Sequence, residues 1–265
     1  MRPTIVAAPL LLATLLAATA PCAQAGAGAT TRISGVTLGV IDLTPQDGAS
    51  AGFTFDTFSS RLIAYTDARN SGGSMESVTI TPLPLSAGTA HTATASATAD
   101  AATSGAIGDV SAYVTTGAGL GQGNLVSADS EQRLWLTLAP HTLLTISGNV
   151  LTEAQRTLGA GEGYRVFTWA SVDITDRDVI TSTTLTRESP LIWGEATTLA
   201  RNSEYFMLAY ANPGAASMQV GLNFLAYADI AVTAVPEPST YLMLLGGLLL
   251  TGAAAFKRGR REYAP

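Results

Sequence analysis

The stretch from residue 218 to residue 233 reads MQVGLNFLAYADIAVT, and this pattern decides the fold class. Apolar residues occupy every second position, while Gln219, Asn223 and Asp229 fall between them. Because successive side chains of a β-strand point to opposite faces, a period of two predicts a long strand with one buried face. The apolar side of that strand comprises Met218, Val220, Leu222, Phe224, Ala226, Ala228, Ile230 and Val232.

The same alternation recurs along most of the chain. Residues 110–114, 134–138 and 166–174 each keep their apolar or small side chains on one side, and turn residues such as Pro140-His141 separate the runs. Many short strands with regular turn signals predict an all-β fold, an antiparallel β-sandwich of the jelly-roll or immunoglobulin-like type.

Three local stretches carry more specific expectations. Asn212-Pro213-Gly214 places proline and glycine where a type II turn requires them, which predicts that the strands on either side pair as a hairpin. Residues 90–104 are almost entirely Ala, Thr and Ser, so they form either a strand with a small-residue face or a pliant linker, and the alternation favours the strand. Residues 151–158, ended by Gly159, are the only helical candidate before the C-terminal tail.

Charge and cysteine content limit what the central segment can do. Residues 26–234, which we expect to form one exported domain, carry nine arginines, no lysine and eighteen acidic residues. A net charge near −9 argues against nucleic acid as a partner, since that requires basic patches. The chain's one cysteine is Cys22, so this segment has no disulfide or thiolate metal site. We expect no cofactor.

The first 25 residues have the pattern of a secretory signal peptide. Arg2 supplies the positive start, residues 5–20 the apolar stretch, and Ala23-Gln24-Ala25 an A-x-A cleavage site for signal peptidase. Lipidation of Cys22 is the alternative, but Pro21 directly before it fits that signal poorly. The apolar stretch is too short for a stable membrane span, so we exclude residues 1–25 from the fold.

Residues 235–265 form a second targeting segment. Residues 239–256 are uncharged and rich in Leu, Gly and Ala, and as a helix they would extend roughly 27 Å, just short of the hydrocarbon core of a bilayer. We therefore predict a single transmembrane helix over 239–256. The cations that follow place the C-terminus in the cytoplasm and the preceding domain on the far side. These cations are Lys257, Arg258, Arg260 and Arg261.

Pro236, Glu237 and Pro238 stand immediately before this span. The tripeptide, the apolar run and the basic end, in that order over residues 235–261, resemble the sorting signal of the PEP-CTERM proteins of Gram-negative bacteria. The resemblance implies recognition of the tripeptide by an exosortase, transient residence in the inner membrane, and passage to the cell surface or the exopolysaccharide matrix. A plain C-terminal anchor is the alternative.

Motifs that could carry catalysis in the central segment are weak. Gly48-Ala49-Ser50-Ala51-Gly52 matches the hydrolase pattern G-x-S-x-G, but a strand follows it where that pattern requires a helix. His91 and His141 have no zinc-ligand spacing, and we interpret them as loop or surface residues. Without a convergent acid, base and nucleophile, we do not expect an enzyme.

Two further patterns suggest ligand binding. Asp173, Asp176 and Asp178 could offer oxygen ligands to calcium, although a solvated strand end is the simpler interpretation. Trp135, Trp169 and Trp193 could stack on sugars; the first two alternate with apolar faces and are expected to point outward unless both sides are buried. The sequence thus favours a structural or interaction module of the cell surface or matrix, with a carbohydrate-binding module as the alternative.

Overall fold

The computed structural model describes residues 26–67, 74–80, 86–117, 123–157, 162–177 and 182–234. Within these ranges every regular element is a β-strand, and the strands form two six-stranded sheets in which all neighbours are antiparallel. No helix that could cross a membrane occurs in these ranges. The sheets belong to one compact unit, Ala25–Pro236. The predicted all-β fold with two antiparallel sheets is confirmed.

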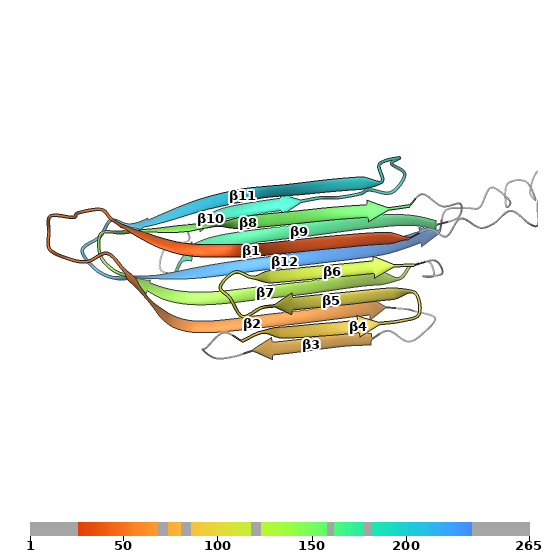
Figure 1. Cartoon of the computed structure of the whole chain (residues 1–265), viewed down its shortest axis with the longest axis horizontal. Coiled ribbons are helices and arrows are strands. Elements are labelled where there is room, and N and C mark those ends of the chain that lie inside the picture. Colours follow the sequence, from red (N-terminus) through yellow and green to blue (C-terminus); the bar gives the residue numbers. More distant parts are fainter. Residues whose placement is uncertain are drawn as a thin grey trace, which may run out of the picture. The chain divides into compact units, whose positions relative to one another are not determined.

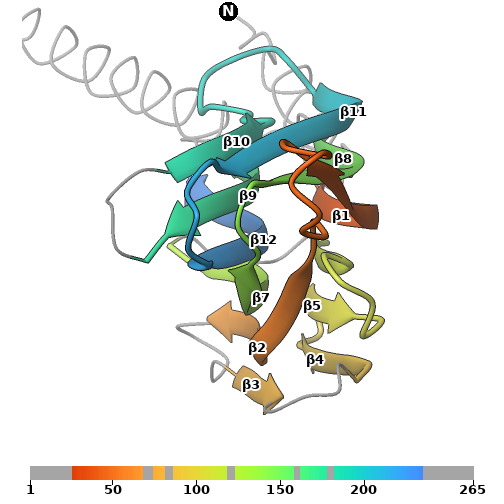
Figure 2. The same cartoon turned by 90° about the vertical axis from the view of Figure 1, so that its left-hand side faces the viewer.

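The two sheets lie face to face as two layers (Figures 1 and 2). Sheet A has the spatial order β11 (Leu199–Asn212), β8 (Thr142–Arg156), β1 (Ala27–Asp42), β6 (Val110–Thr116), β5 (Ala97–Thr103) and β4 (Gly88–Ala93). Sheet B has the order β10 (Ser182–Glu188), β9 (Glu162–Asp176), β12 (Met218–Ala234), β7 (Leu125–Leu138), β2 (Phe53–Asp67) and β3 (Ser74–Ile80).

The core lies between the sheets and is formed by the predicted alternating faces. In β12 every second residue from Val220 to Val232 is buried, and Met218 packs against the edge of the core. β12 lies between β9 and β7 in the middle of sheet B, and its neighbours contribute the alternating faces at 166–174 and 134–138. Residues 218–233 therefore belong to a central strand of the sandwich.

Opposite β2 and β7, sheet A contributes small side chains. Residues 90–104 form two strands, β4 and β5, whose inward side chains include Ala90, Ala97, Ala99 and Ala101. The prediction that this stretch is a β-strand and no linker is confirmed. It contains two strands that pair as a hairpin, where one strand was expected.

The expected hairpin at Asn212-Pro213-Gly214 is wrong. The strand before this turn, β11, lies in sheet A, and the strand after it, β12, lies in sheet B between two other strands. The Asn212 amide fixes this crossing, because its Nδ2 donates to the carbonyl oxygens of Ala139 and Ala216, both at 2.9 Å, and its Oδ1 accepts from Gly214 N at 3.1 Å. Since both edges of β12 are occupied by β7 and β9, β11 pairs elsewhere.

The helical candidate at 151–158 is also wrong where it is described, because Leu151 to Arg156 form the end of β8. This strand pairs with β1 on one side and with β11 on the other. Its alternate side chains Thr152, Ala154 and Arg156 are buried. Pairing on two sides thus overrides the local helical pattern, while residues 158 and 159 lie outside the described ranges.

Arg156 anchors the segment that follows β10. Its buried guanidinium donates to four carbonyl oxygens, those of Tyr164 (2.6 Å), Glu195 (2.7 Å), Ile192 (2.8 Å) and Thr197 (3.0 Å). Four of the five N–H donors of an arginine are therefore used on main-chain acceptors. This side chain thus holds the segment between β10 and β11, together with the backbone bridge between Leu191 and Val166.

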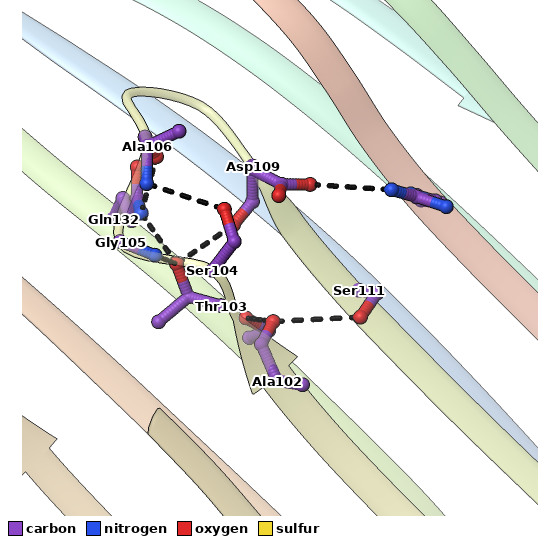
Figure 3. A network of polar contacts seen from close by, with 10 residues as sticks. Ala102, Thr103, Ser104, Gly105, Ala106, Asp109, Ser111 and Gln132 are labelled. Carbon is purple, nitrogen blue, oxygen red and sulfur yellow. Dashed lines mark hydrogen bonds and ion pairs between the residues drawn. The ribbon is translucent and has the colours of Figure 1, made fainter. Parts of the chain in front are cut away.

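Hydrogen bonds also cross between the sheets, and those of Gln132 form the densest group (Figure 3). Gln132 on β7 is fully buried; its Nε2 donates to Thr103 Oγ1 (2.7 Å) and to Ala106 O (3.0 Å), and its Oε1 accepts from Gly108 N (2.7 Å). Thr103 in turn donates to Asp109 O at 2.7 Å. One side chain of sheet B thereby determines the conformation of the turn between β5 and β6 in sheet A.

We predict that Gln132→Met lowers the free energy of unfolding by about 1–3 kcal/mol. Methionine has a similar length, but it leaves the Gly108 N–H buried without its acceptor, and an unsatisfied buried group costs about that amount. The measurement is urea unfolding followed by tryptophan fluorescence.

Gln155→Met is the matched control, because Gln155 is an exposed residue of β8 and surface substitutions usually stay within about 0.5 kcal/mol. Equal losses of unfolding free energy in the two variants would show that the buried hydrogen bonds of Gln132 do not stabilise the domain.

Candidate functional site

The outer face of sheet B carries the charged and aromatic groups that the core cannot accept. The even-numbered residues of β7, of β9 from Tyr164 to Asp176 and of β12 from Val220 to Val232 are buried between the sheets. The odd-numbered residues of these stretches therefore point outward. The strand register then places Trp169, Tyr227 and Asp129 in one row across three strands. A second row contains Glu131 and Arg61.

Two carboxylates and two arginines form a cluster on this face, here called the Arg61 cluster (Arg61, Asp129, Glu131 and Arg133). Arg61 Nη2 lies 3.1 Å from Glu131 Oε2 and 3.4 Å from Asp129 Oδ2, and Arg133 Nη2 lies 2.6 Å from Glu131 Oε1. The Glu131 side chain is only 6% exposed, whereas the two arginines are about half exposed or more. The arginines therefore cover the carboxylates, and a surface hollow of about 240 Å³ opens beside them.

Burial perturbs the Asp129 carboxyl. Desolvation raises the pKa of Asp129, and the Arg61 guanidinium opposes this rise while the Glu131 carboxylate adds to it. Asp129 Oδ1 has no hydrogen-bond partner among the described residues. A carboxyl in this condition favours a proton or a donor supplied from outside more than an ordinary surface aspartate does.

A second pair lies in the neighbouring row. Asp229 is buried although it points outward, and it forms an ion pair and hydrogen bond with Arg165. Desolvation raises the pKa of Asp229, with Arg165 opposing the rise. Burial, together with the nearby Asp229 charge, raises the pKa of Tyr227 to about 12. Perturbed pKa values gathered on one face mark it as a candidate site.

Next to the Arg61 cluster, Trp135 forms a flat platform over Gly221. Gly221 pairs with Trp135 across β12 and β7, and a Cβ added to Gly221 would lie 3.1 Å from the indole Cη2 and Cζ3 atoms. A side chain at position 221 would press on the ring, so glycine lets the indole lie against the strand. A shallow groove of about 170 Å³ runs along the ring, lined also by Arg133, Thr175 and Asn223.

Polar groups frame this platform. Arg177 lies over the Trp135 ring, with its guanidinium carbon 6.0 Å from the ring centre, and donates to Gln219 Oε1. On one side Asp56 accepts from Thr137 Oγ1 at 2.8 Å. On the other side Asn223 Nδ2, with the amide oriented to donate, lies 3.1 Å from Glu131 Oε1. An indole face surrounded by donors and acceptors suits a ligand that is apolar on one side and rich in hydroxyls at its edge.

The other two tryptophans occupy different environments. Trp169 is half-buried, as expected of a residue opposite the apolar face of β9, and its Nε1 has no hydrogen-bond partner among the described residues. Trp193 is 47% exposed beside the exposed Ile192, in the segment held by Arg156. None of the three is fully buried.

The structure does not bring together the described members of the calcium candidate. Asp173 and Asp176 are three residues apart on β9 and therefore point to opposite faces. Asp173 accepts from Ser171 Oγ at 2.7 Å on the outside, while Asp176 points inward and accepts from the Tyr210 hydroxyl at 3.3 Å. Asp178 lies outside the described residues, within which no group of three potential ligands occurs.

The other candidate residues lie in loops and on strand surfaces. Gly48, Ser50 and Gly52 fall in the loop between β1 and β2, and β2 follows directly. His91 is an exposed residue of β4 with Nδ1 2.5 Å from Asp100 Oδ1. His141 has a left-handed backbone (φ 52°) at the turn before β8, which points to a role in the turn. Asp47 bonds Thr44 and Ala49, and the Thr44 hydroxyl is the main cause that lowers the pKa of Asp47.

The predicted targeting residues fall outside the described ranges. They are the cleavage-site residues Ala23 and Ala25, the tripeptide Pro236, Glu237 and Pro238, the span 239–256, and the cations Lys257, Arg258, Arg260 and Arg261.

Comparison with known proteins identifies the C-terminal signal. Residues 234–261 match the PEP-CTERM protein-sorting motif, so the chain carries the sorting signal of an exported, cell-surface-directed protein that an exosortase-type enzyme processes. No curated protein matches the sequence.

Similarity to solved structures is low. The enzymatically active domain of tailspike protein 4 of bacteriophage CBA120 is 12% identical, with 39% of this chain and 16% of that chain covered and a TM-score of 0.10. A structure described for promiscuous carbohydrate-binding modules of the β-sandwich superfamily is 8% identical, with 77% and 98% covered and a TM-score of 0.10.

We predict that Asp129→Asn stabilises the domain more at pH 7 than at pH 4, relative to wild type. A carboxyl whose folded pKa is raised above its unfolded value, about 3.9, contributes stability at low pH that is lost as the pH rises through the folded pKa. Asparagine does not titrate, so the variant does not lose this stability as the pH rises. Urea unfolding at both pH values measures the difference.

Ser127→Ala, a substitution on the same face with no titratable group, should change stability equally at the two pH values. The prediction is contradicted if Asp129→Asn behaves like this control.

Proposed function

We propose that this chain is an exported structural or interaction protein that acts at the cell surface or in the exopolysaccharide matrix after processing by an exosortase. The PEP-CTERM motif at residues 234–261 carries this proposal, because it is a signal for export and sorting. The motif supplies no chemistry of its own. The all-β unit before it is then the passenger.

The proposed route follows from the two targeting segments. Signal peptidase cleaves after Ala25, the helix 239–256 holds the chain temporarily in the inner membrane, and the cations after residue 256 remain in the cytoplasm. The exosortase then acts at Pro236-Glu237-Pro238. A span of roughly 27 Å is short for a bilayer core of roughly 30 Å, which suits a temporary anchor.

A non-catalytic role for the passenger is supported by the state of the carboxylates on the outer face of sheet B. Glu131 and Asp229 are each held in ion pairs with arginines, and Asp129 pairs with Arg61. Carboxylates paired in this way maintain the charge balance of the sheet surface. We therefore propose recognition as the activity of the outer face of sheet B.

The alternative function, carbohydrate binding, is favoured by one specific observation. Trp135 lies flat over Gly221 beside a groove with Arg133, Thr175 and Asn223, and sugars present both an apolar face and a rim of hydroxyl groups. The host's own exopolysaccharide is the natural ligand to test, because the sorting signal directs the chain toward the cell surface.

The sorting route can be tested at the tripeptide. A variant with Pro236→Ala, Glu237→Ala and Pro238→Ala should stay in the inner-membrane fraction of the native host, since the processing enzyme no longer recognises it. Wild type should appear outside the inner membrane without its C-terminal tail. Fractionation followed by mass spectrometry of the C-terminal peptides measures both.

Glu262→Ala with Tyr263→Ala, two substitutions just after the matched residues 234–261, serves as the control for general damage to export. Mature wild-type protein with intact peptides through Arg261 would overturn the processing route and leave a plain anchor.

Carbohydrate binding can be tested at the Trp135 platform. Trp135→Ala should weaken binding to the host exopolysaccharide at least about tenfold, which corresponds to about 1.4 kcal/mol. Gly221→Val should act in the same direction while keeping the indole, because its side chain meets the ring. Affinity electrophoresis in gels containing the polysaccharide measures the effect.

Trp193→Ala is the matched control, as it removes an exposed indole from a loop that is not part of the groove. If Trp135→Ala and Trp193→Ala bind as wild type does, the carbohydrate alternative loses its support, while the sorting route is untouched.

A further inference from the structure

Strand β11 forms one outer edge of sheet A, along the side where β10 ends sheet B (Figure 1). It has 14 residues, whereas the other three edge strands, β4, β3 and β10, have six or seven. Among the described residues only β8 pairs with β11. Alternate N–H and C=O groups along its free edge are therefore available to another strand.

The outward side chains of β11 are unusually apolar for an exposed edge. Leu199, Tyr205 and Met207 are 56%, 66% and 71% exposed, and they share one face of the strand. Natural edge strands are usually protected by short length, lysine, proline or a bulge. β11 has no lysine or proline, and its pairing with β8 runs from Leu199 to Asn212 without a register shift.

The exposed side chains on the two sides of Ser203 complement one another. Reading outward from Ser203, the exposed face meets Arg201 and then Leu199 on one side, and Tyr205 and then Met207 on the other. In an antiparallel pair of two β11 strands centred on Ser203, each Arg201 would face Tyr205 of the other copy, and each Leu199 would face Met207. Directly opposed cross-strand pairs of this kind stabilise a sheet.

The opposite face of the strand fits the same register. Asn202 would lie across from Glu204, so that an amide donor meets a carboxylate and no like charges are opposed. Glu204 already pairs with Arg187 of β10 at 2.5 Å, and Arg201 with Glu153 of β8 at 3.2 Å. These ion pairs hold the charged side chains in position before any partner arrives.

We propose that two copies of this chain associate by antiparallel pairing of their β11 strands about a two-fold axis at Ser203, which joins the two copies of sheet A into one continuous sheet. A second copy fits better than an unrelated partner, because the strand is complementary to its own reverse. A two-fold contact of this kind is closed, so it limits association through β11 to two chains.

The register can be tested by cysteine cross-linking in the full chain. Opposed residues in an antiparallel pair have Cα atoms about 4.5–5.5 Å apart, within the range of a disulfide. Ser203→Cys should therefore give a disulfide-linked dimer on mild oxidation of the detergent-solubilised protein. Ala209→Cys on the same exposed face should not, because the two copies of residue 209 would lie about 40 Å apart.

Wild type controls for the native Cys22, which is the only cysteine of the chain. A dimer with Ser203→Cys alone supports the proposal. The proposal is overturned if Ser203→Cys gives no dimer, or if Ala209→Cys gives as much dimer as Ser203→Cys. If β11 pairs instead with a strand of a different protein, Ser203→Cys gives no dimer.

Association can also be measured without cysteines. Tyr205→Lys places a cation opposite Arg201 of the other copy, and like charges in directly opposed positions destabilise pairing. Sedimentation velocity of the full chain should show the dimer dissociation constant raised at least tenfold. Tyr113→Lys is the matched control: Tyr113 is also an exposed tyrosine on the outer face of sheet A, but on the inner strand β6.

Wild type that sediments as a monomer at all concentrations, or a Tyr205→Lys variant that dimerises like Tyr113→Lys, contradicts the proposal. Neither result bears on sorting or on the Trp135 groove, because no substitution touches the C-terminal signal or sheet B.

Discussion

The sandwich depends on hydrogen bonds that cross between its two sheets, above all those of Gln132. The described strands contain no cysteine, so no disulfide joins the layers. Over β4 and β5 the inner face of sheet A is built largely of alanine, which offers little apolar area, and here the buried polar groups of both sheets meet. Gln132 satisfies Gly108, Thr103 and Ala106, and elsewhere between the sheets Thr66 of β2 and Thr92 of β4 pair at 3.2 Å. Such bonds are directional, so they fix how one sheet sits on the other where apolar packing alone would fix it poorly.

The sequence correctly predicted which side of a strand each residue occupies, because this depends on local alternation. It failed to predict which strands pair with one another. The faces of β7, β9 and β12 could be assigned because each residue's side follows from its neighbour's. The turn at Asn212-Pro213-Gly214 was identified, but nothing local shows that β12 is already flanked by β7 and β9. For the same reason residues 151–156 carried a helical pattern and became part of β8, which is paired on two sides.

The candidate site shows the same division. Trp135 and Trp169 were expected to point outward from the parity of their positions, and both are half-buried on the outer side of sheet B. The Arg61 cluster was missed, because it needs the register between β2 and β7, and Arg61 is 70 positions from Glu131. The alternation of Asp129, Glu131 and Arg133 on one face of one strand was the available signal. The flat Trp135 could not be foreseen either, since it depends on Gly221 lying directly opposite.

Arg156 has a consequence for how this scaffold can vary. Its acceptors are the carbonyl oxygens of Tyr164, Ile192, Glu195 and Thr197, and every amino acid carries such an oxygen. The bonds therefore specify the path of the backbone between β10 and β11 and leave most side chains there unconstrained. Ile192 and Trp193 project from a fixed frame whose hold does not depend on their identity. The segment resembles an interchangeable display position, in which surface chemistry can diversify while the fold beneath it stays the same.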